Sequence, residues 1–320
     1  MGQPPGPGAE AVAVINVRYH LLALAAVTVA VASGLALGSA VVDGPANEDL
    51  RGEAQSLRTS NTQLRDRLAV MEDELTSRER YVRDAAPLLL DDTLADTRVL
   101  VLALPGATGR HVDAVARNLR LADAEITGTV RVTAKLTDPA YREDARDLAT
   151  RLLPPNVTDI PDDADGAAAS AAVLAAALVE HQPAVAAADR TAAVAGYRAG
   201  ELIDVDGELE EPAQSVVVVA GPPASGDRAT ERSAAVLTLV ERFGGAAPAV
   251  LVSADARHPV SRVRRDASLS RVISTVDDVS TALGQLSAAL ALVERTNDQK
   301  TGHYGVGAGA EDRIPKPTGR

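Results

Sequence analysis

The sequence contains no cysteine and no tryptophan, and its single phenylalanine is Phe243. The lack of cysteine excludes disulfides, thiol nucleophiles, iron–sulfur clusters and zinc ribbons. Aromatic residues make up only 2% of the chain, which argues against carbohydrate clefts, aromatic cages and stacking platforms for single-stranded nucleic acid. Any hydrophobic core must therefore be built from alanine, valine and leucine.

The charge balance excludes a second class of partner. The net charge is −12 and the sequence pI is near 4.9, whereas phosphate-backbone binding depends on clustered lysine and arginine. We therefore expect no nucleic-acid partner. With 320 residues, of which 46% are hydrophobic, the chain is long enough for one large domain or two small ones.

A long uncharged run predicts a membrane anchor. Residues 21–42 contain no charged side chain, and as a helix they would extend about 33 Å, enough to cross a hydrocarbon core about 30 Å thick. Arg18 lies just before the run and acidic residues come after it. The positive-inside rule then predicts a single-pass cell-membrane protein with residues 1–20 as a cytoplasmic tail and the bulk of the chain extracytoplasmic.

A cleaved signal peptide is the alternative for the same run. Gly38, Ser39 and Ala40 resemble a cleavage site of small residues. The apolar part of a secretory signal is usually about 7–15 residues long, and this one is longer. The length favours an uncleaved anchor.

Two glycines within the run could support helix pairing. Gly34 and Gly38 are four residues apart, so they share one helix face and would let two backbones approach closely. Because small residues are common in membrane helices, this motif carries weight only in combination with the heptad pattern of the neighbouring segment.

Residues 47–84 predict a parallel, dimeric coiled coil. Apolar residues alternate at spacings of three and four, with Leu at most d positions, and Asn61 at a central a position would fix register and a two-stranded state. The alternative is an amphipathic helix that packs on its own domain. The expected d positions are Leu50, Leu57, Leu64 and Met71, and the a positions are Asn47, Ala54, Asn61, Leu68, Leu75 and Val82.

After the coil, the pattern predicts an extracytoplasmic α/β domain over residues 95–296. Apolar runs that alternate with helical segments indicate a mostly parallel sheet between two helical layers. The Gly-rich end, residues 297–320, is expected to be a flexible tail. Strands are expected at 99–104, 129–133, 215–220, 249–252 and 272–275, with an acidic linker at 159–166 and a last helix over 279–293.

Motifs for phosphate binding are incomplete in this domain. Gly106, Gly109 and Arg110 could cradle an anion at a helix start, but the full G-x-G-x-x-G is missing. Gly221 and Gly226 have the spacing of a P-loop, yet the expected Lys and Ser/Thr are replaced by an acid and an arginine.

Catalytic signals are also weak. Asp277 and Asp278 could form an acid pair, but we expect them to offset the dipole at a helix N-terminus, with Asp278 three residues after Thr275. The sequence contains no G-x-S-x-G motif. We expect no catalytic site and no bound cofactor.

The five histidines do not form a recognisable metal motif. No two of them are four residues apart, and the chain lacks the Cys or Met clusters that copper(I) prefers. His258 and His303 are the weak candidates for metal ligands. His303, in the Gly-rich stretch, is expected to be solvated.

The order of these segments resembles a known family. The run Val14–His20 leads into the apolar segment and the coil, and the chain ends with Ile273–Asp278 and Gly302–Gly307. Together they resemble mycobacterial copper transport protein B (MctB), an actinobacterial copper transporter family. The resemblance implies an envelope location, a role in copper efflux or homeostasis, and copper as the species handled. Some members are also linked to cell-wall integrity and division through a partner membrane protein.

Three hypotheses for function remain. The first is a membrane-anchored copper-homeostasis protein that is not itself a pore, because one apolar helix per chain cannot enclose a channel. The second is a non-catalytic dimeric scaffold or adaptor that acts with a partner membrane or cell-wall protein. The third is an enzyme for a small anionic substrate, which would depend on Arg110 or Asp277.

Overall fold

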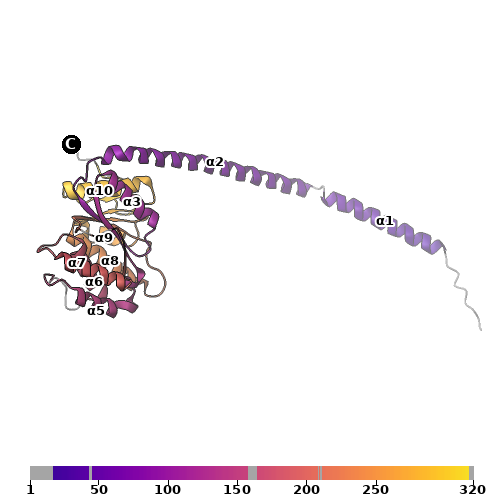
Figure 1. Cartoon of the computed structure of the whole chain (residues 1–320). Helices are drawn as coiled ribbons and strands as arrows, with labels where there is room; N and C mark the ends of the chain where they lie inside the picture. Colours follow the sequence, from indigo (N-terminus) through magenta and orange to yellow (C-terminus); the bar gives the residue numbers. More distant parts are fainter. Residues whose placement is uncertain (1–16, 43–44, 158–163, 208, 210, 317–320) are drawn as a thin grey trace, which may run out of the picture. The chain divides into compact units, whose positions relative to one another are not determined.

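The computed structural model describes residues 17–42, 45–157, 164–207, 209 and 211–316 (Figure 1). The chain divides into two compact units, residues 1–74 and 75–320, which are described separately. The predicted linker at 159–166 falls largely outside the described residues, and so do most of the tail at 1–20 and the last four residues.

The first unit is helical. Helix α1 (Val17–Val42) contains the predicted span, and the part from His20 to Gly38 is long and apolar enough to cross a membrane. Helix α2 (Pro45–Leu90) begins in this unit and ends in the second. An apolar N-terminal helix is thus confirmed, while its orientation and the cleavage alternative stay predictions.

The second unit is a mixed α/β domain, as predicted. Its strands are β1 (Arg98–Ala103), β2 (Glu125–Val132), β3 (Ile203–Asp206), β4 (Ser215–Val219), β5 (Ala249–Val252), β6 (Ile273–Val276) and β7 (His303–Tyr304). Its helices are α3 (Gly109–Leu121), α4 (Ala134–Thr137), α5 (Arg142–Leu152), α6 (Gly166–Leu178), α7 (Ala187–Ala199), α8 (Ala229–Ala246), α9 (Val260–Arg265) and α10 (Ala282–Asn297), with 3-10 turns η1 (Pro139–Tyr141) and η2 (Leu269–Arg271).

The described strands form one sheet in the order β3-β2-β1-β4-β5-β6-β7. Among them β2 and β3 pair antiparallel, and the other neighbours run parallel. The apolar runs of the central strands are explained by burial on both faces. In β1, for example, Leu100 and Leu102 face one core and Val99 and Val101 face the other.

Helices cover both faces of this sheet, which gives the predicted three layers. One core contains residues of α3, α10 and the end of α2, and the other contains residues of α4 to α9. Figure 1 shows α3 and α10 on one side of the strands and α5 to α8 on the other.

The end of α2 belongs to the domain core. Ala86 and Leu90 are buried, and Val82 packs against the same cluster. Val82 was expected at the last a position of a coiled coil, so at this position the helix matches the alternative prediction and packs on its own domain.

The two edge strands were not predicted. Strand β3 is short, and its two hydrophobic residues alternate with aspartates, so its hydrophobic pattern is weak. Strand β7 lies in the Gly-rich stretch that was expected to be a flexible tail. That expectation is wrong for His303 and Tyr304, which are buried and pair with Thr275 and Val276 of β6. Strand β2 also starts four residues before the predicted one.

Candidate functional site

A buried ion pair lies where β6 ends. Arg264 Nη1 is 2.6 Å from Asp277 Oδ2, and the two side chains are 2% and 0% exposed. Arg264 also donates to Thr275 Oγ1 (2.8 Å) and to the Tyr304 carbonyl (2.8 Å). Because charge in a core is costly unless it is paired and fully hydrogen-bonded, this network must be complete to be tolerated.

The Gly-rich segment folds over this ion pair. Val306 and Gly307 donate their backbone N–H groups to Asp277, at 2.8 and 3.0 Å. Gly305 has φ +129°, and a Cβ there would collide with the Asp277 carboxylate. Sequence reasoning missed this clasp of residues 305–307 over Asp277. The available signal was the glycine run itself, because glycine often marks a place where backbone approaches another group closely.

The expected helix cap at Asp277 and Asp278 is therefore wrong. Helix α10 begins at Ala282, and its N-cap is Thr281, whose hydroxyl accepts a hydrogen bond from Gly284 N at 3.0 Å. Asp278 is buried, and its Oδ1 has no hydrogen-bond partner. Burial and the neighbouring Asp277 raise the pKa of Asp278, while Thr281 and Arg313 oppose the shift.

The two histidine candidates are both removed from full solvent. His303 Nδ1 lies 3.0 Å from Thr275 Oγ1 in a buried hydrogen bond, which corrects the expectation of a solvated side chain. Burial and Arg264 lower the pKa of His303, while Glu311 opposes them. Burial, followed by Arg262, lowers the pKa of His258.

Nowhere in the described ranges do three or more His, Asp or Glu side chains form a group that could hold a metal ion. The chemistry of His258 and His303 as weak copper ligands thus stays a prediction. A lowered pKa favours the neutral imidazole in both residues, and this is the form that binds metal.

The loops with the incomplete phosphate-binding motifs lie at the centre of the sheet, between the ends of β1 and β4. This is the position where open α/β sheets usually bind ligands. A Cβ at Gly221 would collide with the backbone of Pro105 and Gly106, so the two loops are in direct backbone contact. Arg110 is exposed on α3, and Gly226 precedes the left-handed Arg228 at the start of α8.

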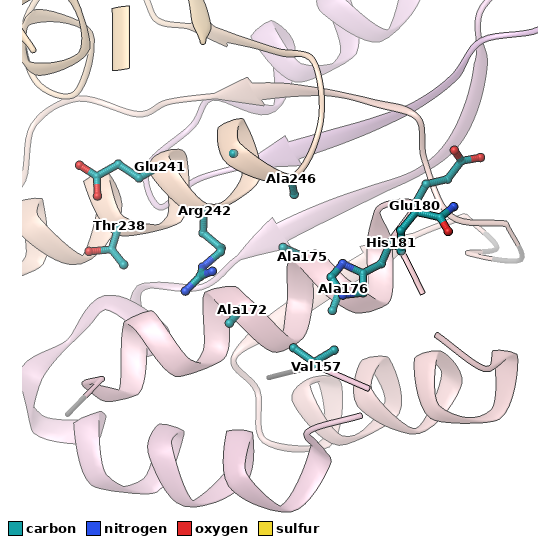
Figure 2. A pocket seen from close by; sticks show the side chains of 12 residues that line it. Val157, Ala172, Ala175, Ala176, Glu180, His181, Thr238, Glu241, Arg242 and Ala246 are labelled. Carbon is teal, nitrogen blue, oxygen red and sulfur yellow. The ribbon is translucent and has the colours of Figure 1, made fainter. Parts of the chain in front are cut away.

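A cavity of about 610 Å³ lies between α6 and α8, on the opposite side of the sheet from α10 (Figure 2). Sequence reasoning missed it. The available signal was the small residues at Ala172, Ala175 and Ala176, which share one face of α6. The cavity is lined by Val157, Ala172, Ala175, Ala176, Glu180, His181, Gln182, Thr238, Glu241, Arg242, Gly245 and Ala246.

The residues predicted to form a dimer lie on exposed surface. Leu57, Leu64, Leu68, Met71 and Leu75 are each 57–65% exposed. Asn61 is exposed as well, whereas only the backbone of Leu50 is among the described residues. A Cβ at Gly34 or Gly38 would meet no atom within 4 Å.

Comparison with known proteins finds relatives along nearly the whole chain. The family described as "Copper transport outer membrane protein, MctB" matches residues 14–315. A protein of Mycobacterium tuberculosis named "Copper transporter MctB" is 28% identical over 311 residues, which covers 92% of this chain and 98% of that protein. A protein of the same name from Mycobacterium leprae is 28% identical over 318 residues, with the same coverage.

Proposed function

This chain belongs to the MctB family of copper transport proteins, and from that membership we propose that it acts in copper efflux and homeostasis as a membrane-anchored homodimer. Copper is the species handled rather than a resident cofactor. The protein is a non-catalytic component that works with a membrane or cell-envelope partner and is not itself the pore. Its N-terminus is cytoplasmic and its α/β domain extracytoplasmic.

The observation that carries the proposal is the exposed apolar seam of α2, which consists of Leu57, Leu64, Leu68, Met71 and Leu75. Water-exposed leucines at a and d spacing along a helix are unfavourable for an isolated chain, and a second copy removes them from water. Asn61 lies among them at an a position, where two asparagines can hydrogen-bond to each other and fix the register. Gly34 and Gly38 would extend the same two-fold contact along α1.

The proposal of a component rather than a pore is supported by the membrane helix. Among the described residues one helix, His20–Gly38, is suited to crossing a membrane. A dimer would contribute two such helices, and their glycine face is suited to close packing rather than to an open channel. Copper would then cross with the help of the partner.

Changing seam leucines to acids tests both parts of the proposal. The triple variant Leu57→Asp, Leu64→Asp and Leu68→Asp should be monomeric in detergent by analytical ultracentrifugation, because it would bury like charges in the seam. In a deletion strain it should leave cellular copper as high as with no protein at all. Val70→Asp is the matched control, since Val70 is 68% exposed but lies off the seam.

Two outcomes of this experiment would contradict different parts of the proposal, the role in copper homeostasis and the need for a dimer. Normal copper content in the deletion strain would overturn the role in copper homeostasis. A monomeric triple variant that restores normal copper would overturn the need for a dimer and leave the copper role standing.

The scaffold or adaptor function is favoured by a second exposed surface on α2. Tyr81 and Leu88 are 75% and 85% exposed, and seven residues apart they share one helix face. They lie away from Leu75 and from the buried Ala86.

The double variant Tyr81→Ser and Leu88→Ser should stay dimeric and lose its crosslinks to the partner protein in intact cells. Unchanged crosslinks would contradict the role of this surface in partner binding.

A further inference from the structure

We propose that the open edge of strand β3, together with the groove between β3 and α7, binds an extended segment of a partner protein in which aliphatic and basic side chains alternate. The segment would add a strand to the sheet, which is an established mode of peptide recognition. This surface is separate from the seam of α2 and from Tyr81 and Leu88, so the proposal depends neither on the dimer nor on copper.

Strand β3 lies at the edge of the sheet. Among the described strands it has one neighbour, β2. Thr133 N donates to the Leu202 carbonyl, and antiparallel strands exchange hydrogen bonds through every second residue. The backbone groups of Asp204 and Asp206 therefore face β2, while the N–H and C=O of Val205 point away from the sheet. An outward row of this kind is a template for a further strand.

The outward N–H of Val205 is satisfied locally. It donates to Oδ1 of the preceding residue, Asp204, at 2.9 Å. A side chain that bonds to neighbouring backbone takes the place of a strand at such a position, and charge at an edge prevents indiscriminate pairing. An incoming strand can replace the carboxylate with its own carbonyl, so that the N–H stays hydrogen-bonded throughout.

A groove beside this edge offers a place for side chains. It has a volume of about 290 Å³, with Ala177 among the residues that line it. Its apolar walls are Val194 of α7 and, from the β3 side, Val205 and Leu209, all half-buried and packed against the domain core. Side chains of a strand alternate between its two faces. Every second residue of an added strand would therefore point towards the groove, where an aliphatic group gains from burial.

Two arginines of α7 disfavour a cation on the groove side. Arg190 and Arg198 both line the groove, and Arg190 donates to the Val185 carbonyl at 3.2 Å. A lysine that entered the groove would meet charges of its own sign, whereas an aliphatic side chain would not. The groove therefore selects aliphatic residues on this face of the segment.

The opposite face of the edge is acidic. Asp204 and Asp206 are exposed and alternate with Val205, so their side chains lie on the face away from the groove. Residues 204–211 include five acidic residues and no basic ones. On the paired side of β3, Arg131 of β2 lies directly opposite Asp204, and opposite charges in such cross-strand pairs are stabilising. A basic residue in an added strand would repeat that pairing on the open side.

Peptides with a defined pattern test the proposal. Full-length protein in detergent is titrated with a fluorescent peptide of three Lys-Val repeats, and binding is followed by anisotropy. The comparison peptides are three Glu-Val repeats and a Lys/Val peptide of equal composition with its lysines in one block. We expect saturable binding of the Lys-Val repeats and at least about tenfold weaker binding of both comparisons. Equal binding of the block peptide would show that net charge alone attracts it and would overturn the proposal.

Backbone pairing is tested by N-methylation of the peptide. One version is methylated at its valine nitrogens and another at its lysine nitrogens. Because a strand presents alternate N–H groups to each side, one version should lose binding and the other keep it. Bound peptide should also slow hydrogen exchange at the Val205 N–H and leave exchange at Asp206, which faces β2, unchanged. Binding that survives both methylations would overturn strand addition.

A matched pair of variants locates the groove. Ala195 of α7 is exposed and lines the groove, so Ala195→Phe fills it without entering the core. Ala192 is exposed on the same helix but lies outside the groove lining. Ala195→Phe should weaken binding of the Lys-Val repeats at least about tenfold, and Ala192→Phe should bind as the unchanged chain does. Equal binding by the two variants would overturn the assignment of this groove.

Discussion

The carboxylate of Glu79 accepts a hydrogen bond from the backbone N–H of Ala282, at 2.7 Å and across 203 residues of sequence. Ala282 is the first residue of α10, so this N–H has no partner within its own helix. Thr281 caps the third residue, Gly284, in the same turn. A residue of α2 thus completes the cap of a core helix.

Removing the Glu79 carboxylate should loosen the start of α10. Loss of a capping group costs about 1 kcal/mol, with a smaller contribution from the helix dipole. We expect Glu79→Ala to raise hydrogen exchange at the first turn of α10 about fivefold. Glu72→Ala, also on α2 but outside this contact, should leave exchange in α10 unchanged; equal exchange in both variants would contradict the role of Glu79.

Breaking the Arg264–Asp277 pair should be far more costly. Removal of one partner leaves a buried charge unpaired, which costs about 3–5 kcal/mol. Asp277→Ala should therefore lower the free energy of unfolding by about that amount in urea titrations and expose the Gly-rich segment to limited proteolysis. Removing both charges in Arg264→Met with Asp277→Ala should recover part of the loss. A loss below about 1 kcal/mol in the single variant would show that the pair is not essential.

Gly305→Ala tests the backbone of the clasp. The positive φ and the collision with Asp277 make any side chain unfavourable, so we expect a loss of about 1–3 kcal/mol in the free energy of unfolding. Gly245→Ala is the contrasting control, because its Cβ enters open space within α8. There alanine should be neutral or stabilise by up to about 1 kcal/mol.

Asp278 should make stability fall as the pH rises. Its folded pKa is raised above the usual 3.8 by burial and by Asp277, so between 3.8 and the folded pKa the folded state binds more protons than the unfolded state. Under that condition the free energy of unfolding decreases with pH. The protonated carboxyl is the stabilising form.

Asp278→Asn removes the titrating carboxyl. The free energy of unfolding of this variant should therefore rise relative to that of the unchanged chain as the pH goes from about 4 to about 7. The comparison is the difference between the two unfolding free energies at each pH, so the histidines cancel. A difference that does not change with pH would contradict the raised pKa.

Features set by local pattern could be predicted. The uncharged run around Gly34 and Gly38 predicted helix α1, because a membrane-length apolar helix needs only composition and length. The continuous apolar runs at 99–104 and 215–220 predicted central strands, since only a strand buried on both faces tolerates them. The heptad spacing of Leu57, Leu64 and Leu68 predicted the long helix α2, and its pairing with a second copy stays a prediction.

Features that depend on contacts between distant residues could not be predicted. The acids at 277 and 278 looked like a helix start because neither Arg264 nor the Gly-rich segment is near them in sequence. Strand β7 forms only because β6 offers an unpaired edge and Asp277 accepts the N–H groups that come after Tyr304.

An apolar N-terminal helix, a long amphipathic helix and a largely parallel α/β domain could all be derived from the residue order, because each depends only on the length, composition or hydrophobic period of its own segment. The packed fold was needed to show which face of α2 joins the core, how Arg264 and Asp277 neutralise each other, and where α6 and α8 leave a cavity. These depend on which side chains meet across the fold, and periodicity along one segment carries no information about the shape and charge of its neighbours.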